Sequence, residues 1–232
     1  MFTIRRANRR GHFNHGWLDT WHTFSFADYY DPEMMGFYSL RVMNEDRVGF
    51  GAGFGMHPHR DMEIITYVLE GELQHKDSLG NGAVIHTGEL QQMTAGTGVL
   101  HSEFNPSPSQ EVHLYQIWLH PRQKGLKPSY DQRRFDPKLR VNRWQTVASP
   151  DGQENSLTIQ QDASLMLANL EAGHQLVYDF APKHGGWLQI LRGGLTSNGE
   201  PLHPGDGVAI EDENRLVVEA TSDAEVLLFD LK

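Results

Sequence analysis

Short apolar runs separated by turn-forming residues recur along most of the chain. Residues 64–69 are apolar and rich in β-branched side chains, and residues 113–119 form a second run of this kind. Between them, Leu79-Gly80-Asn81-Gly82 carries a hairpin signal. Short runs punctuated by Gly, Asn, Asp and Pro favour strands over helices. The pattern over residues 57–119 therefore predicts at least six short strands arranged as a β-barrel or sandwich.

The region before these strands is rich in aromatic and glycine residues. Residues 37–42 are predicted to form a strand, and Asn44-Glu45-Asp46 the turn that ends it. The glycines within residues 49–55 lack the Lys-Ser/Thr ending of a P-loop, so we expect tight turns there and not a phosphate site. Six aromatic side chains earlier in the chain fit either core packing or a lid over a pocket mouth. These are Trp17, Trp21, Phe24, Phe26, Tyr29 and Tyr30.

The second half of the chain repeats parts of the first. Residues 68–73 resemble residues 190–195, and residues 86–89 resemble residues 203–206. A Pro- and charge-rich stretch over residues 120–140 is typical of a linker. We therefore expect two copies of one β-barrel, an N-terminal barrel over 1–130 and a C-terminal barrel over 131–232. Ten of the 13 His lie in residues 1–120, so the second barrel is expected to lack metal ligands.

Two short segments carry the candidate chemistry. His57 and His59 are spaced i, i+2, as are His101 and Glu103, and on a strand this spacing places both side chains on one face. Three imidazoles and a carboxylate suit a divalent transition metal such as iron, manganese, cobalt, nickel or copper. There is no Cys, so thiolate ligation is excluded. On an unbroken strand Glu63 would share the face of His57, so the spacing leaves Glu63 and Glu103 both open as the carboxylate.

Charge and hydropathy limit the partners. The formal net charge is −10, which gives no support for binding to a nucleic-acid backbone. The basic residues near the start, Arg5, Arg6, Arg9 and Arg10, fit a solvated edge. No apolar run approaches the roughly 20 residues of a membrane span, and the Arg-rich start is not followed by a signal-peptide core. We expect a cytoplasmic monomer that binds neither nucleic acid nor membrane.

Longer motifs resemble the cupins and, within them, the pirin family. Gly51, five residues, His57-Pro58-His59, Glu63 and then Gly71 resemble the first cupin motif, and Gly96-Thr97-Gly98, His101 and Asn105 resemble the second. The gap from Glu63 to Gly71 is one residue longer than the usual cupin form, and Gly96-Thr97-Gly98 replaces Pro-x-Gly. Stretches across nearly the whole chain resemble pirins, namely Trp21-His22-Thr23-Phe24-Ser25-Phe26, Leu40-Arg41-Val42 and His101-Ser102-Glu103.

The resemblance implies a fold, a ligand set and a cofactor. Pirins are all-β bicupins, with two tandem jelly-roll-like barrels of which the first binds one metal. Carried over by position, the ligands are His57, His59, His101 and Glu103, and Glu63 would orient a ligating imidazole. We expect Fe²⁺, with Mn, Co, Ni, Cu or Zn as alternatives.

The resemblance is greatest to bacterial pirins described as quercetin 2,3-dioxygenases. It implies that a flavonol binds through its 3-hydroxyl and loses that proton. O₂ then adds across the central ring, which opens with release of CO. Glu103 is the expected base, with Glu63 second. A metal-binding regulatory pirin that binds protein partners without turnover is the alternative, and a cupin whose metal only stabilises the barrel is a third.

Overall fold

The computed structural model describes residues 1–232 and consists of strands with three short 3-10 helices. Contacts divide the chain into two units. The N-terminal unit comprises Gly11–Phe135 and Leu157–Gln161. The C-terminal unit comprises Met1–Arg10, Asp136–Ser156 and Asp162–Lys232. The all-β class expected from the short apolar runs is confirmed, and the helices η1 (Ala7–Arg9), η2 (Pro137–Arg140) and η3 (Gln153–Asn155) lie in connections.

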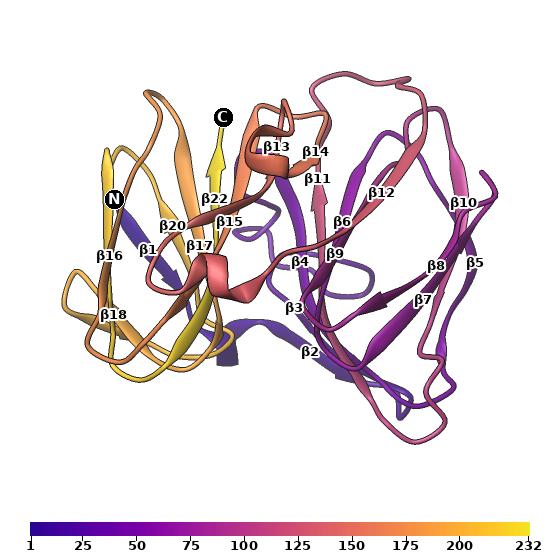
Figure 1. Cartoon of the computed structure of the whole chain (residues 1–232), viewed down its shortest axis with the longest axis horizontal. Coiled ribbons are helices and arrows are strands. Elements are labelled where there is room, and N and C mark those ends of the chain that lie inside the picture. The colour runs from indigo at the N-terminus through magenta and orange to yellow at the C-terminus, as the bar shows by residue number, and fades with distance from the viewer. The chain divides into compact units, whose positions relative to one another are not determined.

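The N-terminal unit contains two antiparallel sheets (Figure 1). Its large sheet has the order β12-β9-β6-β11-β4-β3-β2, and its small sheet has the order β5-β10-β7-β8. The large-sheet strands are β2 (Gly11–Asn14), β3 (Leu18–His22), β4 (Leu40–Val48), β6 (Glu63–Glu70), β9 (Glu89–Thr94), β11 (Val112–Leu119) and β12 (Ser129–Arg134). The small-sheet strands are β5 (Gly53–His59), β7 (Glu72–Asp77), β8 (Gly82–His86) and β10 (Val99–Phe104). Apolar side chains of both sheets, such as Val68 and Leu73, pack together into a buried core.

The C-terminal unit repeats this arrangement. One sheet includes β1-β20-β17-β22-β15-β13 in that order, and the other has the order β16-β21-β18-β19. The strands are β1 (Phe2–Arg5), β13 (Gln145–Ser149), β15 (Ala163–Leu170), β17 (Gly185–Arg192), β20 (Gly207–Ile210) and β22 (Ala224–Leu231), then β16 (Gln175–Asp179), β18 (Leu195–Ser197), β19 (Glu200–Leu202) and β21 (Arg215–Ala220). A further short strand, β14 (Leu157–Thr158), belongs to a segment of the N-terminal unit. The two copies inferred from the internal repeat are confirmed strand by strand.

The best-matched part of the repeat is a turn that requires glycine. Gly71 between β6 and β7 has φ +77°, and Gly193 between β17 and β18 has φ +71°. A Cβ on Gly71 would lie 2.7 Å from the backbone oxygen of Glu111, and one on Gly193 would meet the backbone oxygen of Asp223. Both the backbone conformation and the close approach exclude a side chain. The same tight turn therefore links the equivalent strands in each unit.

The units defined by contacts differ from a simple division along the sequence. β1, at the start of the chain, pairs with β20 of the C-terminal unit. β12 pairs with β9 of the N-terminal unit, although it lies mostly beyond residue 130. The division into 1–130 and 131–232 therefore stays a proposal about the two sequence copies. Pairing between strands that are far apart in the sequence decides which segments belong to each folded unit.

One predicted turn is wrong. β4 runs without a break from Leu40 to Val48, through Asn44 and Asp46. It is hydrogen-bonded to β11 on one side and to β3 on the other, so the ladder overrides the turn preference of Asn and Asp. Asn44 and Asp46 alternate along this strand and are both buried.

Candidate metal centre

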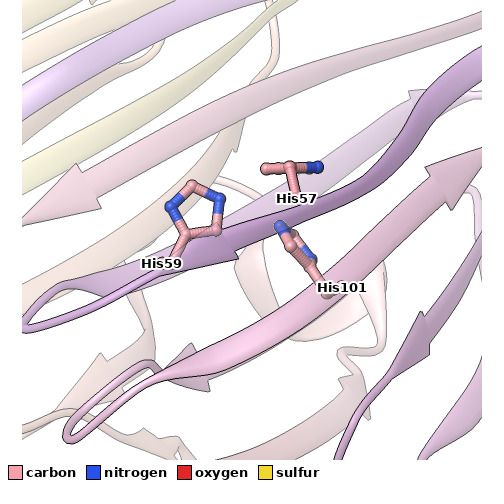
Figure 2. Close-up of side chains that lie close together, drawn as sticks. All are labelled: His57, His59 and His101. Carbon is pink, nitrogen blue, oxygen red and sulfur yellow. The ribbon is translucent and has the colours of Figure 1, made fainter.

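Three imidazoles converge on the small sheet of the N-terminal unit. His57 and His59 lie on β5, and His101 lies opposite His57 on the neighbouring strand β10. Figure 2 shows the three rings on the same side of the two strands, turned toward one another. Their ring centroids are 4.4 to 4.8 Å apart, and one nitrogen from each ring lies within 4.8 Å of the others. The three imidazoles predicted to converge do so, whereas Glu103 is not part of this group of three.

The imidazole nitrogens fit a cation. Both ring nitrogens of His101 are buried and have no hydrogen-bond partner in the protein. His57 Nδ1 lies 2.8 Å from the Gly55 carbonyl oxygen, so when Nδ1 carries the proton the Nε2 lone pair is available to bind a cation. Burial lowers the pKa of His59 to about 4 and of His101 to about 3, and neighbouring imidazoles add to both shifts. Neutral imidazole is the metal-binding form, so the donor set fits a divalent transition metal.

Glu103 is close to one of these imidazoles. It is buried and forms a second group of metal-binding side chains with His101 and His75. Gln91 Nε2 donates to Glu103 Oε1 at 2.5 Å, and Gln116 Nε2 donates to Oε2 at 2.8 Å. These amides hold the carboxylate in one orientation. The ligand set of three His and Glu103 stays a proposal, with Glu103 on the β10 side of the site.

Glu63 lies elsewhere. β5 ends at His59, and Asp61 has a φ of +50°, so no continuous strand joins His57 to Glu63 and the face-sharing argument fails. Three polar groups surround the Glu63 carboxylate: Gln92 Nε2 at 2.8 Å, Thr94 Oγ1 at 3.0 Å and the Gln160 backbone N–H at 3.1 Å. None of these is an imidazole, and burial raises the pKa of Glu63. The expected role of Glu63 beside a ligating imidazole is not supported by these contacts.

A cavity of about 80 Å³ adjoins the imidazoles. Strands β5 and β10 form one wall of the cavity, and β4 and β11 form the other. The ring of Phe26, outside these four strands, and the ring of Phe54 on β5 close the cavity. The lining residues are Phe26, Asn44, Asp46, Phe54, His57, His59, His101, Glu103, Gln116 and Trp118. The aromatic belt thus has both of the roles considered: Phe24 is buried in the core, whereas Phe26 lines the cavity.

Five polar or aromatic lining residues were missed by sequence reasoning: Asn44, Asp46, Phe54, Gln116 and Trp118. Asp46 is buried, accepts a hydrogen bond from Thr20 Oγ1 at 2.5 Å, and has its pKa raised to about 7 by burial. The signal for Gln116 was a polar residue within the apolar run 113–119. Asn44 and Asp46 gave an i, i+2 polar pair, which the predicted turn concealed.

The C-terminal unit lacks an equivalent cluster. On its facing strands β16 and β21, the side chains directed to the interior are apolar or aromatic, with Leu176 opposite Val218 and Tyr178 opposite Leu216 at the hydrophobic core. Both groups of metal-binding side chains in the structure lie in the N-terminal unit.

A repeated β-barrel pair with a histidine-rich cavity in the first barrel defines a bicupin with one candidate metal centre. Comparison with known families agrees: residues 3–119 match the family model described as Pirin, and residues 146–231 match the model described as quercetinase C-terminal cupin domain. The chain belongs to the pirin family, as its motifs suggested.

Similar proteins cover the full length. A quercetin 2,3-dioxygenase of Escherichia coli K12 is 52% identical over 231 residues, which span 100% of this chain and 99% of that protein. A putative quercetin 2,3-dioxygenase of Pseudomonas aeruginosa is 43% identical, with 100% of each chain covered. The crystal structure of bacterial pirin YhhW from Escherichia coli in complex with nickel(II) has a TM-score of 0.95 at 52% identity, covering 100% of this chain and 99% of that one.

No helix of the structure has the length and apolar character that crossing a membrane requires.

Proposed function

We propose that this protein is a metal-dependent flavonol dioxygenase of the quercetin 2,3-dioxygenase type. The observation that carries the proposal is the convergence of three imidazoles on a cavity with aromatic walls. A relative 52% identical over its full length is named quercetin 2,3-dioxygenase, and a nickel complex of a similar pirin supports a divalent cation. We expect Fe²⁺ in this chain, with Mn, Co, Ni, Cu or Zn as alternatives.

The residues of the cavity have separate roles. His57, His59 and His101 hold the cation, and Glu103 is the fourth ligand. When bound, a divalent cation lowers the pKa of a coordinated hydroxyl and so favours loss of the flavonol 3-hydroxyl proton. Glu103 would accept that proton at Oε2, while the amide of Gln91 keeps its other oxygen in place. Glu63 does not line the cavity, which supports Glu103 ahead of Glu63 as the proposed base.

The size of the cavity favours a second candidate. Sites for drug-sized ligands usually have volumes of about 300–1,000 Å³, whereas this cavity has about 80 Å³. A flavonol therefore enters only if a ring at the cavity, such as Phe54 of β5, moves aside. A metal-binding regulatory module that recognises a protein partner needs no such movement, so it remains the alternative to turnover.

Turnover of quercetin separates the two candidates. Protein loaded with Fe²⁺, and separately with each alternative metal, is mixed with quercetin and O₂, and flavonol absorbance and CO are followed together. The dioxygenase proposal predicts loss of absorbance with matching release of CO. Metal-stripped protein and His59→Ala are the controls and should give flat traces. Flat traces from every fully loaded sample would refute turnover and favour the regulatory module. The cytoplasmic location and the monomeric state stay predictions.

A further inference from the structure

The cavity wall opposite the imidazoles presents two polar atoms without partners. Strands β4 and β11 are adjacent, with Asn44 opposite Gln116 and Val42 opposite Trp118. Asn44 and Trp118 both line the cavity. Asn44 Oδ1 and Trp118 Nε1 are buried and have no hydrogen-bond partner in the protein. Buried polar atoms are nearly always hydrogen-bonded, so an orphaned acceptor and an orphaned donor in one cavity indicate a ligand that satisfies both.

The surroundings fix both side chains in place. The Trp118 ring packs edge-on against His59 at 4.8 Å between centroids and against Phe26 at 5.3 Å. Asn44 is 3% exposed, on a strand that is paired on both edges. A rigid donor and acceptor cost a ligand little ordering entropy when they bind it.

We propose that Asn44 and Trp118 form a hydrogen-bonding subsite that selects a planar aromatic ligand with a second hydroxyl beside its metal-binding end. Asn44 Oδ1 accepts a hydrogen bond from that hydroxyl, and Trp118 Nε1–H donates to the ligand oxygen next to it. The inference rests on the proposed flavonol site. It states which hydroxyl group makes one flavonol bind there more tightly than another. A site built to hydrogen-bond a hydroxyl discriminates strongly against the analogue that lacks it.

Anaerobic binding titrations test this without turnover. Metal-loaded protein is titrated with quercetin and with 3-hydroxyflavone. Quercetin carries a hydroxyl next to the 4-carbonyl, on the fused ring, and 3-hydroxyflavone lacks that hydroxyl. Trp118→Phe keeps the ring and removes the N–H, while Asn44→Leu removes the acceptor at similar volume. Trp144→Phe is the matched control, because Trp144 Nε1 donates to the Val177 carbonyl in the other unit. Metal content and melting temperature are recorded for every variant.

The expected results differ between the two variants. Trp118→Phe should raise the Kd of both ligands about tenfold, as for one lost hydrogen bond. Asn44→Leu should raise the Kd of quercetin about tenfold and leave that of 3-hydroxyflavone nearly unchanged, so the preference of the wild type for quercetin falls about tenfold. An unchanged affinity in Trp118→Phe, or an unchanged preference in Asn44→Leu, overturns the subsite while leaving the flavonol site standing. Wild-type protein that binds neither flavonol overturns both.

Discussion

The buried carboxyl of Asp46 should make the stability of the metal-free protein depend on pH. Burial raises its pKa from 3.8 to about 7, against the opposing effect of the Thr20 hydrogen bond. Between these values the unfolded chain has lost the proton and the folded chain has kept it. The free energy of unfolding therefore falls as pH rises from about 4 to about 7, and this contribution is constant above that range.

The size of the effect follows from the interval between the two pKa values. Each pKa unit corresponds to about 1.4 kcal/mol, so the full loss is at most about 4 kcal/mol. Asp46→Asn keeps an oxygen that accepts the hydrogen bond from Thr20, and its side chain cannot ionise. The variant should therefore become more stable than the wild type, by a margin that grows as pH rises. Asp28→Asn, at an exposed position of the same unit, is the control and should show no such gain.

Urea unfolding of metal-stripped protein at intervals from pH 4.5 to 8.5 measures this difference directly. Titrating groups remote from Asp46 affect the wild type and the variant alike, so the difference between them reports Asp46 together with its coupling to Glu103 and Glu45. We expect the advantage of Asp46→Asn to grow by about 2–4 kcal/mol across the range. A difference that is independent of pH, or that shrinks as pH rises, would refute the burial argument.

Three further predictions concern the ligands and the repeated turn. Glu103→Gln should weaken metal affinity about 10- to 100-fold by equilibrium dialysis, whereas Glu63→Gln should leave it unchanged, and the reverse order would make Glu63 the ligand. Because the pKa of His59 is lowered to about 4 and that of His101 to about 3, protons should displace the cation only near pH 4. Metal analysis after dialysis checks this, and release already at pH 6.5 would contradict it. Gly71→Ala, at φ +77°, should lower stability by about 1–3 kcal/mol in thermal unfolding, and an unchanged melting temperature would count against the strained turn.

The fold and the imidazoles could be predicted because they depend on local periodicity. His57 and His59 share a face through strand alternation alone, and the convergence with His101 then needs only that two strands be neighbours. The turn glycines of the two copies were likewise visible, because their conformation excludes other residues.

The rest depends on pairings that no short window of sequence contains. β4 is hydrogen-bonded along both edges, so Asn44 and Asp46, where a turn was expected, lie within a strand that forms a cavity wall. The left-handed backbone conformation of Asp61 interrupts the strand, so Glu63 does not share the face of His57. Pairing of β1 with β20 placed the first residues of the chain in the C-terminal unit. In each case long-range hydrogen bonding prevailed over local preference.

Metal content per chain tests the central claim most directly. Wild-type protein, His59→Ala and His86→Ala are loaded with one divalent metal, desalted and analysed for metal, with circular dichroism to report folding. His86 is an exposed imidazole of the same unit and serves as the matched control. We predict one cation per chain in the wild type and in His86→Ala, and almost none in a His59→Ala variant that remains folded. Full metal content in His59→Ala would contradict the site built from three imidazoles on β5 and β10.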